Sequence, residues 1–168
     1  MRVEQTRQYP LCAQAFLNRL TSQAFYEERF RLLGVEDYRF QRCEQTPEGF
    51  VVHIVRRMEV DLSRIPAFAR GFIGSTAELS TEFVWQNEGE APYLGRYYVS
   101  MAGAPAKIEG QVVLNALGDS ACEQEVALTI HCSVPLVGKK LAALLAKRVE
   151  VVLEEDYQAT LRLLKAHP

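Results

Sequence analysis

The spacing of hydrophobic and polar positions changes several times along the chain, and the longest uniform stretch is the last one. Residues 137–166 keep a helical period and contain no proline and no glycine other than Gly138. At 1.5 Å per residue, a helix of this length would extend about 45 Å. Such a helix needs a large surface to lie on, and the preceding pattern predicts a sheet.

Between residues 35 and 134 the hydrophobic positions recur mainly every second residue, which is typical of strands with one buried face. The clearest case is 77–86, where Ala77, Leu79, Thr81, Phe83 and Trp85 alternate with a second row that is expected to face water, Val84 included. Turn residues separate the runs, as in Thr46–Gly49. The predicted strands are 2–9, 35–45, 50–61, 77–86, 93–101, 108–117 and 122–134.

Two short helices are predicted after the first strand, over 12–20 and from Thr21 or Ser22 to Leu33, the second closed by Gly34. In the second helix, Phe25, Tyr26, Phe30 and Leu33 form an apolar stripe. We expect its charged residues to face water, namely Glu27, Glu28, Arg29 and Arg31. Residues 62–74 break the strand pattern and predict a loop or a short helix.

This order of elements, a strand, two helices, further strands and a long helix, resembles the helix-grip superfamily, which includes START lipid-transfer domains, plant pathogenesis-related allergens and polyketide cyclases. The segments Val134–Leu141 and Phe25–Arg29 are similar to an uncharacterised bacterial branch of it. The resemblance implies an α+β fold in which a curved seven-stranded antiparallel sheet wraps around the C-terminal helix, with a cavity between them. It implies no particular reaction, because the superfamily includes carriers, receptors and enzymes.

Composition limits the classes of partner. The chain has 168 residues, 48% of them hydrophobic, and shows no linker, so we expect one domain over 1–168. A net charge of −2 and a pI near 6.0 argue against nucleic acid as a partner. No apolar run has the length of a signal peptide core or a membrane span, so a cytoplasmic location is expected.

The cysteines and histidines predict no metal site, and no cofactor is expected because the sequence has no Walker loop and no dinucleotide fingerprint. Cys12, Cys43, Cys122 and Cys132 are dispersed and form no Cys-x-x-Cys pair, which favours free thiols in a reducing compartment. His53, His131 and His167 have no neighbour at metal-ligand spacing. His53 and His131 also lie on the strand faces that are expected to be exposed, so a catalytic histidine is disfavoured.

One candidate for chemistry is Asp156 in the last helix. At 100° per residue, this carboxylate lies within the apolar face formed by residues such as Val149 and Val152. A carboxylate there is costly unless it is paired or protonated, which suggests function. The alternatives are that it hydrogen-bonds a loop beyond the thick part of the core, or that the helix is rotated or frayed there. Arg148 and Glu155 flank this face as expected rim residues.

A second candidate is Arg56, which shares its strand face with apolar residues from Phe50 to Val60. If Phe40 pairs with Ile54, then Tyr38 lies opposite Arg56. Such an arginine and tyrosine can hold a carboxylate, carbonyl or enolate in an apolar pocket. Alternatively, Arg56 and Asp156 form an internal ion pair that leaves nothing for a ligand.

The apolar residues of the inferred concave side complete the predicted ligand-binding set. Aromatic residues on adjacent strands either pack in the core or line the cavity. The predicted ligand-binding residues are Arg56, Tyr38, Phe83, Trp85, Tyr97, Val149, Val152 and Asp156. No catalytic residue is assigned.

Three functional hypotheses follow. The first is a noncatalytic protein that binds or carries an apolar small molecule, such as a lipid, fatty acid, quinone or polyketide-like compound. The second is a cofactor-independent cyclase or dehydratase in which Arg56 and a tyrosine polarise a carbonyl and Asp156 is the base. The third is a protein-interaction module whose core is filled by its own side chains. The abundance of apolar lining favours the first, while the ligand and the oligomeric state stay open.

Overall fold

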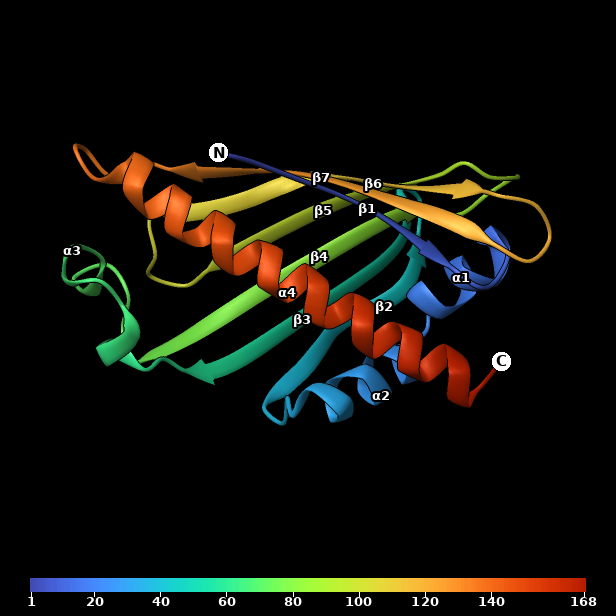
Figure 1. Cartoon of the computed structure of the whole chain (residues 1–168), viewed down its shortest axis with the longest axis horizontal. Coiled ribbons are helices and arrows are strands. Elements are labelled where there is room, and N and C mark those ends of the chain that lie inside the picture. Colours follow the sequence, from blue (N-terminus) through green and yellow to red (C-terminus); the bar gives the residue numbers. More distant parts are fainter.

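The long C-terminal helix lies along the concave face of a strongly curved antiparallel sheet (Figure 1). The computed structural model describes all residues, 1–168. The strands are β1 (Arg2–Tyr9), β2 (Tyr38–Thr46), β3 (Gly49–Glu59), β4 (Thr76–Gln86), β5 (Tyr93–Met101), β6 (Ala106–Ala116) and β7 (Cys122–Cys132). The helices are α1 (Ala13–Leu20), α2 (Gln23–Leu33), a 3-10 turn η1 (Leu62–Arg64), α3 (Ala67–Arg70) and α4 (Gly138–Ala166).

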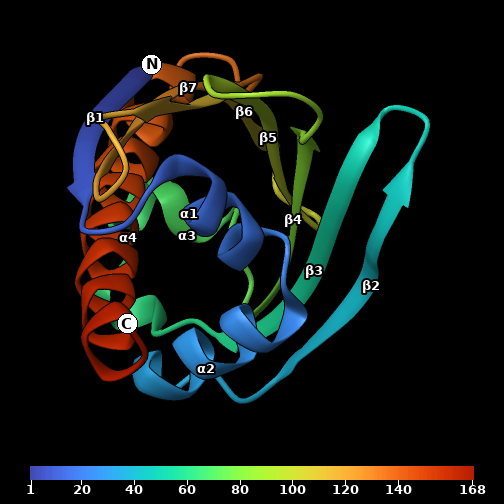
Figure 2. The same ribbon diagram turned by 90° about the vertical axis from the view of Figure 1, so that its right-hand side faces the viewer.

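The sheet has seven strands in the order β1-β7-β6-β5-β4-β3-β2. Consecutive strands from β2 to β7 are neighbours, and β1 adds to the far edge beside β7. Viewed along the molecule, the sheet curves around a central space, with α4 on one side and α1 and α2 at one end (Figure 2). The predicted helix-grip architecture is therefore confirmed, including the two short helices that follow the first strand.

The β2–β3 hairpin has the predicted register, with Phe40 opposite Ile54 and Tyr38 opposite Arg56. The alternating pattern did not predict the irregularity between Phe40 and Arg42, where the register shifts. Val84 also departs from the expected pattern. It is buried on the outer face of the sheet, opposite the buried Val51 of β3, so that face is not uniformly wet.

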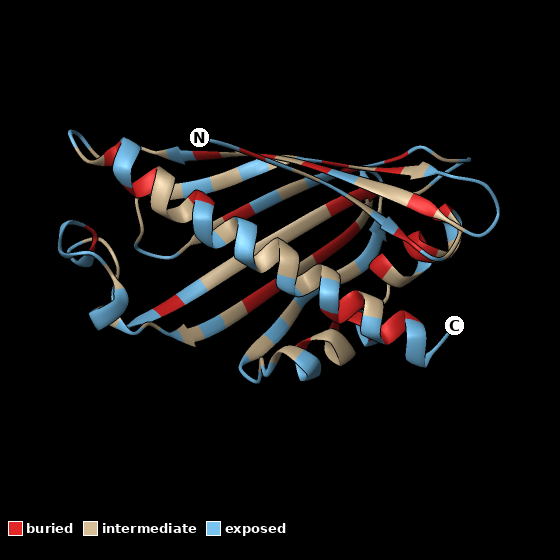
Figure 3. Cartoon of the chain, in the orientation of Figure 1, coloured by how far each residue is buried: buried red, intermediate tan, exposed pale blue.

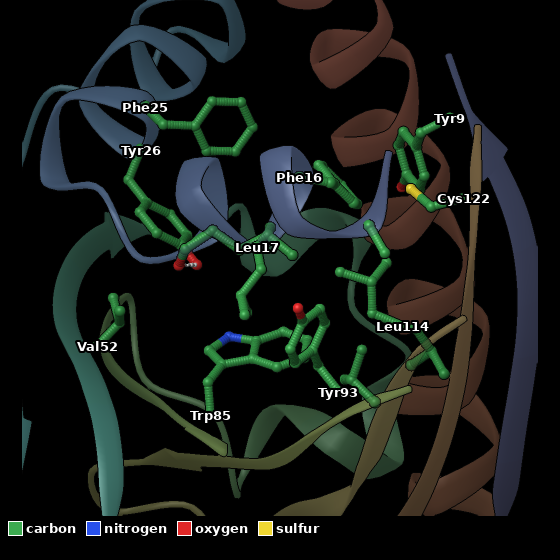
Figure 4. Packing of buried hydrophobic residues seen from close by; sticks show 14 of the residues in the cluster. Tyr9, Phe16, Leu17, Phe25, Tyr26, Val52, Trp85, Tyr93, Leu114 and Cys122 are labelled. Carbon is green, nitrogen blue, oxygen red and sulfur yellow. Dashed lines mark hydrogen bonds between the residues drawn. The ribbon is translucent and has the colours of Figure 1, made fainter. Parts of the chain in front are cut away.

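The main hydrophobic core lies at the end of the sheet that α1 and α2 cover, and Figure 4 shows part of it. Trp85 is fully buried there. Its indole lies against Gly95 of the neighbouring strand, and an added Cβ at Gly95 would come within 2.9 Å of the ring. The absence of a side chain at Gly95 therefore makes room for the tryptophan.

A second, smaller cluster of buried residues lies at the other end of α4. It consists of Val3, Ile130, Ala142 and Ala146. The C-terminal end of α4 belongs to the main core through Leu163 and Leu164. The long helix is thus held at its two ends by two different clusters.

Candidate functional site

The middle of α4 is less tightly packed than its ends. The buried residues of the helix lie within 138–146 and 159–164, and none lies between 147 and 158 (Figure 3). Two of the intervening inward residues, Val149 and Val152, are only partly buried. A helix with an apolar stripe that is left half-covered in its middle spans an unfilled space.

That space is a cavity of about 520 Å³ between α4, α2 and strands β3 to β6. Thirteen of its 17 lining residues are hydrophobic, including Leu33, Met58, Val99, Ile108, Leu145 and Val152. The charged lining residues are Arg56, Arg148, Glu155 and Asp156. The cavity is therefore an apolar enclosure with a few charged groups, which is the usual composition of a small-molecule site.

A smaller space of about 60 Å³ adjoins the large cavity on the side of the main core. Tyr97, Leu153 and Asp156 line both spaces, so they form the partition between them. The inner space also contacts Tyr26, Arg29 and other polar side chains. Burial raises the pKa values of the Tyr26 and Tyr97 hydroxyls well above the ordinary range, so both stay neutral at alkaline pH values at which an exposed tyrosine ionises.

The predicted ligand-binding residues lie in three different places in the structure. Arg56, Tyr97, Val149, Val152 and Asp156 line the large cavity. Phe83 and Trp85 line only the smaller inner space. Tyr38 lines neither, because its ring packs on Phe30 with the ring centroids 4.7 Å apart. The strand register that places Tyr38 opposite Arg56 therefore does not bring its ring into the cavity.

Arg29 corrects one prediction from the sequence. We expected it to face water, but only 12% of its side chain is exposed, and its Nε lies 4.0 Å from Oδ1 of Asp156. Its guanidinium also lies 5.1 Å from the ring centroid of Tyr26. Asp156 is thus the partner of Arg29. No ion pair within 4.0 Å joins it to Arg56, so the direct pair that the sequence left open is absent.

The helical spacing does contain a signal for the position of Arg29. The residue follows Phe25 by four positions and Tyr26 by three, so it belongs to the face that these two aromatic residues define. An arginine on such a face packs its aliphatic stem and its guanidinium against the aromatic rings, while its charge pairs with a carboxylate. The prediction that Arg29 faces water was wrong because it followed from the charge of the residue and not from its position around the helix axis.

Arg56 differs from the other cavity arginines because it has no charged partner. Its Nε, like that of Arg29, is buried and has no hydrogen bond, and its guanidinium lies 5.5 Å from the ring centroid of Phe30. Burial lowers the pKa of Arg56, which the charge of Asp156 partly offsets. By contrast, Arg148 lies 3.8 Å from Glu155, and both of these rim side chains are at least half exposed.

His53 and His131, the two histidines of the strands, lie away from the cavity on the outer side of the sheet. His53 is half-buried, with Nε2 2.7 Å from Oγ of Ser80, and the exposed His131 lies 3.0 Å from Glu109. The structure contains no group of three or more His, Cys, Asp or Glu side chains that could hold a metal ion. No helix combines the length and the apolar character needed to cross a bilayer.

The order of the strands and the position of α4 across the concave face of the sheet define a protein with the helix-grip fold. The chain belongs to the family described as protein of unknown function (DUF2505), which matches residues 4–164. A comparison with curated proteins gives no match.

Several solved structures share the fold. The protein TTHA0849 from Thermus thermophilus has a TM-score of 0.66 at 17% identity, with 100% of both chains covered. A START superfamily protein from Mycobacterium smegmatis has a TM-score of 0.61 at 13% identity, with 99% of both chains covered. The Zhui aromatase/cyclase from a Streptomyces species has a TM-score of 0.59 at 15% identity, covering 96% of this chain and 89% of that one. At these identities the likeness establishes the fold alone.

Proposed function

We propose that the protein binds or carries an apolar small molecule in the cavity between the sheet and α4. The observation that carries this proposal is a space of about 520 Å³ whose lining is mostly hydrophobic. Sites for drug-sized ligands range from roughly 300 to 1,000 Å³ and have this kind of lining. Covering an apolar lining of this extent with a ligand is favourable, because it removes apolar surface from water. The similar structures, which include a START superfamily protein, support the same use of the fold.

The arrangement of Asp156 favours binding over catalysis. The cyclase or dehydratase hypothesis needs this carboxylate as an isolated inward base. Instead it has Arg29 at 4.0 Å, and about a third of its side chain, 32%, is exposed. The likeness to an aromatase/cyclase keeps that hypothesis as the alternative. The third hypothesis, a filled core, fits less well because the chain's own side chains leave the middle of α4 half-covered.

A neutral fluorescent probe, N-phenyl-1-naphthylamine, tests the proposal. We expect its emission to rise on binding, and Val152→Trp to abolish that rise because the indole would occupy the cavity. Val151→Trp is the matched control, since Val151 is the next residue of α4 and its side chain is exposed. Equal probe binding by a folded Val152→Trp variant and the wild type would contradict the proposal.

A further inference from the structure

The charges around the cavity do not balance. Three arginines, Arg29, Arg56 and Arg148, accompany two carboxylates, Glu155 and Asp156. Arg29 lies 4.0 Å from Asp156, and Arg148 lies 3.8 Å from Glu155, so each carboxylate already has its own arginine. Arg56 is the cation that remains.

The surroundings of Arg56 make this surplus charge costly. Its Nε is cut off from solvent and has no hydrogen-bond partner, and the ring of Phe30 packs near its guanidinium. Its neighbours in the cavity wall are apolar, such as Met58 and Leu79. A buried donor without a partner loses its water without compensation, and the charge of the partly buried Arg56 loses part of its hydration as well. An anion placed beside the guanidinium would remove both deficits.

We propose that the ligand of this cavity is an apolar molecule with a single anionic head group of the carboxylate class, and that Arg56 binds this head group. The inference rests on the proposed function, because it assumes that the cavity binds a ligand. A guanidinium matches a carboxylate in shape and can donate two parallel hydrogen bonds to it. The apolar body of the ligand then contacts Val149 and Val152 of α4.

A single negative charge fits better than two. One carboxylate neutralises Arg56, whereas the second charge of a phosphate monoester would find no free cation. It would also lie in a cavity that already contains Glu155 and Asp156. The same charge count disfavours a cationic amphiphile, which would meet Arg56 without an anion to compensate it.

Displacement of N-phenyl-1-naphthylamine by molecules with the same ten-carbon chain tests the inference. Decanoate, 1-decanol, decylamine and decyl phosphate each have ten carbon atoms and differ in the head group, which in decanoate includes the tenth carbon. We expect the wild type to bind decanoate more tightly than decylamine or decyl phosphate. In Arg56→Met, the Kd ratio of decanol to decanoate should fall about tenfold or more, because one charge-assisted pair is lost. Arg57→Met is the matched control, since Arg57 is the next residue of β3 and is exposed on the other face; its ratio should equal that of the wild type.

The outcomes separate the inference from the proposed function. If decanol does not displace the probe, or if the probe does not bind, the cavity is not an apolar site and the proposed function fails. Should decylamine or decyl phosphate bind as tightly as decanoate to the wild type, the cavity binds apolar molecules but the carboxylate assignment is wrong. An unchanged ratio in Arg56→Met would also overturn the role of Arg56. The wild-type comparison decides the head group even if Arg56→Met does not fold.

Discussion

Arg29 of α2 and Asp156 of α4 face each other at 4.0 Å at the boundary between the inner space and the large cavity. The Nη1 of Arg29 also lies 3.5 Å from Oγ1 of Thr160, a fully buried hydroxyl one turn further along α4. The contact joins the short N-terminal helices to the C-terminal helix. It also places a positive charge beside Asp156, a partly buried carboxylate on the apolar face of α4.

A double-mutant cycle of Arg29→Met and Asp156→Asn measures this contact. Each single change leaves a charged or polar group without its partner in a largely buried position, so each should destabilise the fold. We expect the two changes to be coupled by about 0.5 to 2 kcal/mol in the free energy of unfolding, measured by urea denaturation.

The pair Arg148 and Glu155 is the control for that cycle, because both of its side chains are mainly exposed and the atoms lie 3.8 Å apart. Exposed ion pairs contribute little, so Arg148→Met and Glu155→Gln should be coupled by less than about 0.5 kcal/mol. Coupling of the Arg29 and Asp156 changes that is no larger than this would show that their charges do not interact in the folded protein.

Gly95→Ala should destabilise the protein by about 1 to 3 kcal/mol through overpacking. The new methyl group would come within 2.9 Å of the fully buried Trp85 indole, so the indole or the strand would have to shift. Gly71→Ala is the control, since nothing lies within 4 Å of its added Cβ. Urea denaturation followed by Trp85 emission reports both changes, and equal effects would mean that the indole does not pack on Gly95.

The order of elements was predictable because each element has a strong local signal. The period of two in 77–86 and the helical period of 137–166 arise from burying one face, and turn residues such as those of Thr46–Gly49 mark where the strands end. The irregularity after Phe40 had no such signal, because a shift of register leaves the composition of a strand unchanged.

The site was only partly predictable, since a cavity depends on how far side chains reach across curved surfaces. The alternation of inner and outer residues along β3 correctly placed Arg56 on the inner face of the sheet. The projection of α4 at 100° per residue correctly placed Asp156 on the face of the helix that lines the cavity. Neither pattern could show that Arg29, from another helix, lies nearer to Asp156 than Arg56 does. The alternation along a strand also cannot distinguish two residues on the same inner face, such as Trp85, which packs in the core, and Tyr97, which reaches the cavity.

The stability of the protein should fall between about pH 9 and pH 11 in part through Cys122. Burial raises the pKa of the Cys122 thiol to about 11, with a smaller contribution from the nearby Cys12 thiol. In this interval the unfolded chain, with a thiol pKa of about 8.5, releases the proton while the folded chain retains it. The unfolded state therefore binds fewer protons, so the free energy of unfolding decreases as pH rises.

Cys122→Ala isolates this effect. The variant loses some packing at every pH, but its free energy of unfolding should decline less steeply above about pH 9 than that of the wild type. The buried tyrosines titrate in both proteins and cancel in the comparison. Identical slopes in urea denaturation at alkaline pH would show that the Cys122 thiol has no raised pKa in the folded state.

The half-covered middle of α4 can be tested with one kind of substitution at three positions, since Val→Ile adds a single methylene each time. Val52 is fully buried in the core, so Val52→Ile should destabilise by about 1 kcal/mol or more through overpacking. Val152 borders the cavity, so Val152→Ile should instead be neutral or stabilise by up to about 0.8 kcal/mol, the gain for burying one methylene. Val151→Ile, at an exposed position, controls for helix propensity. If Val152→Ile costs as much as Val52→Ile in urea denaturation, the middle of α4 is already packed and no ligand space lies beneath it.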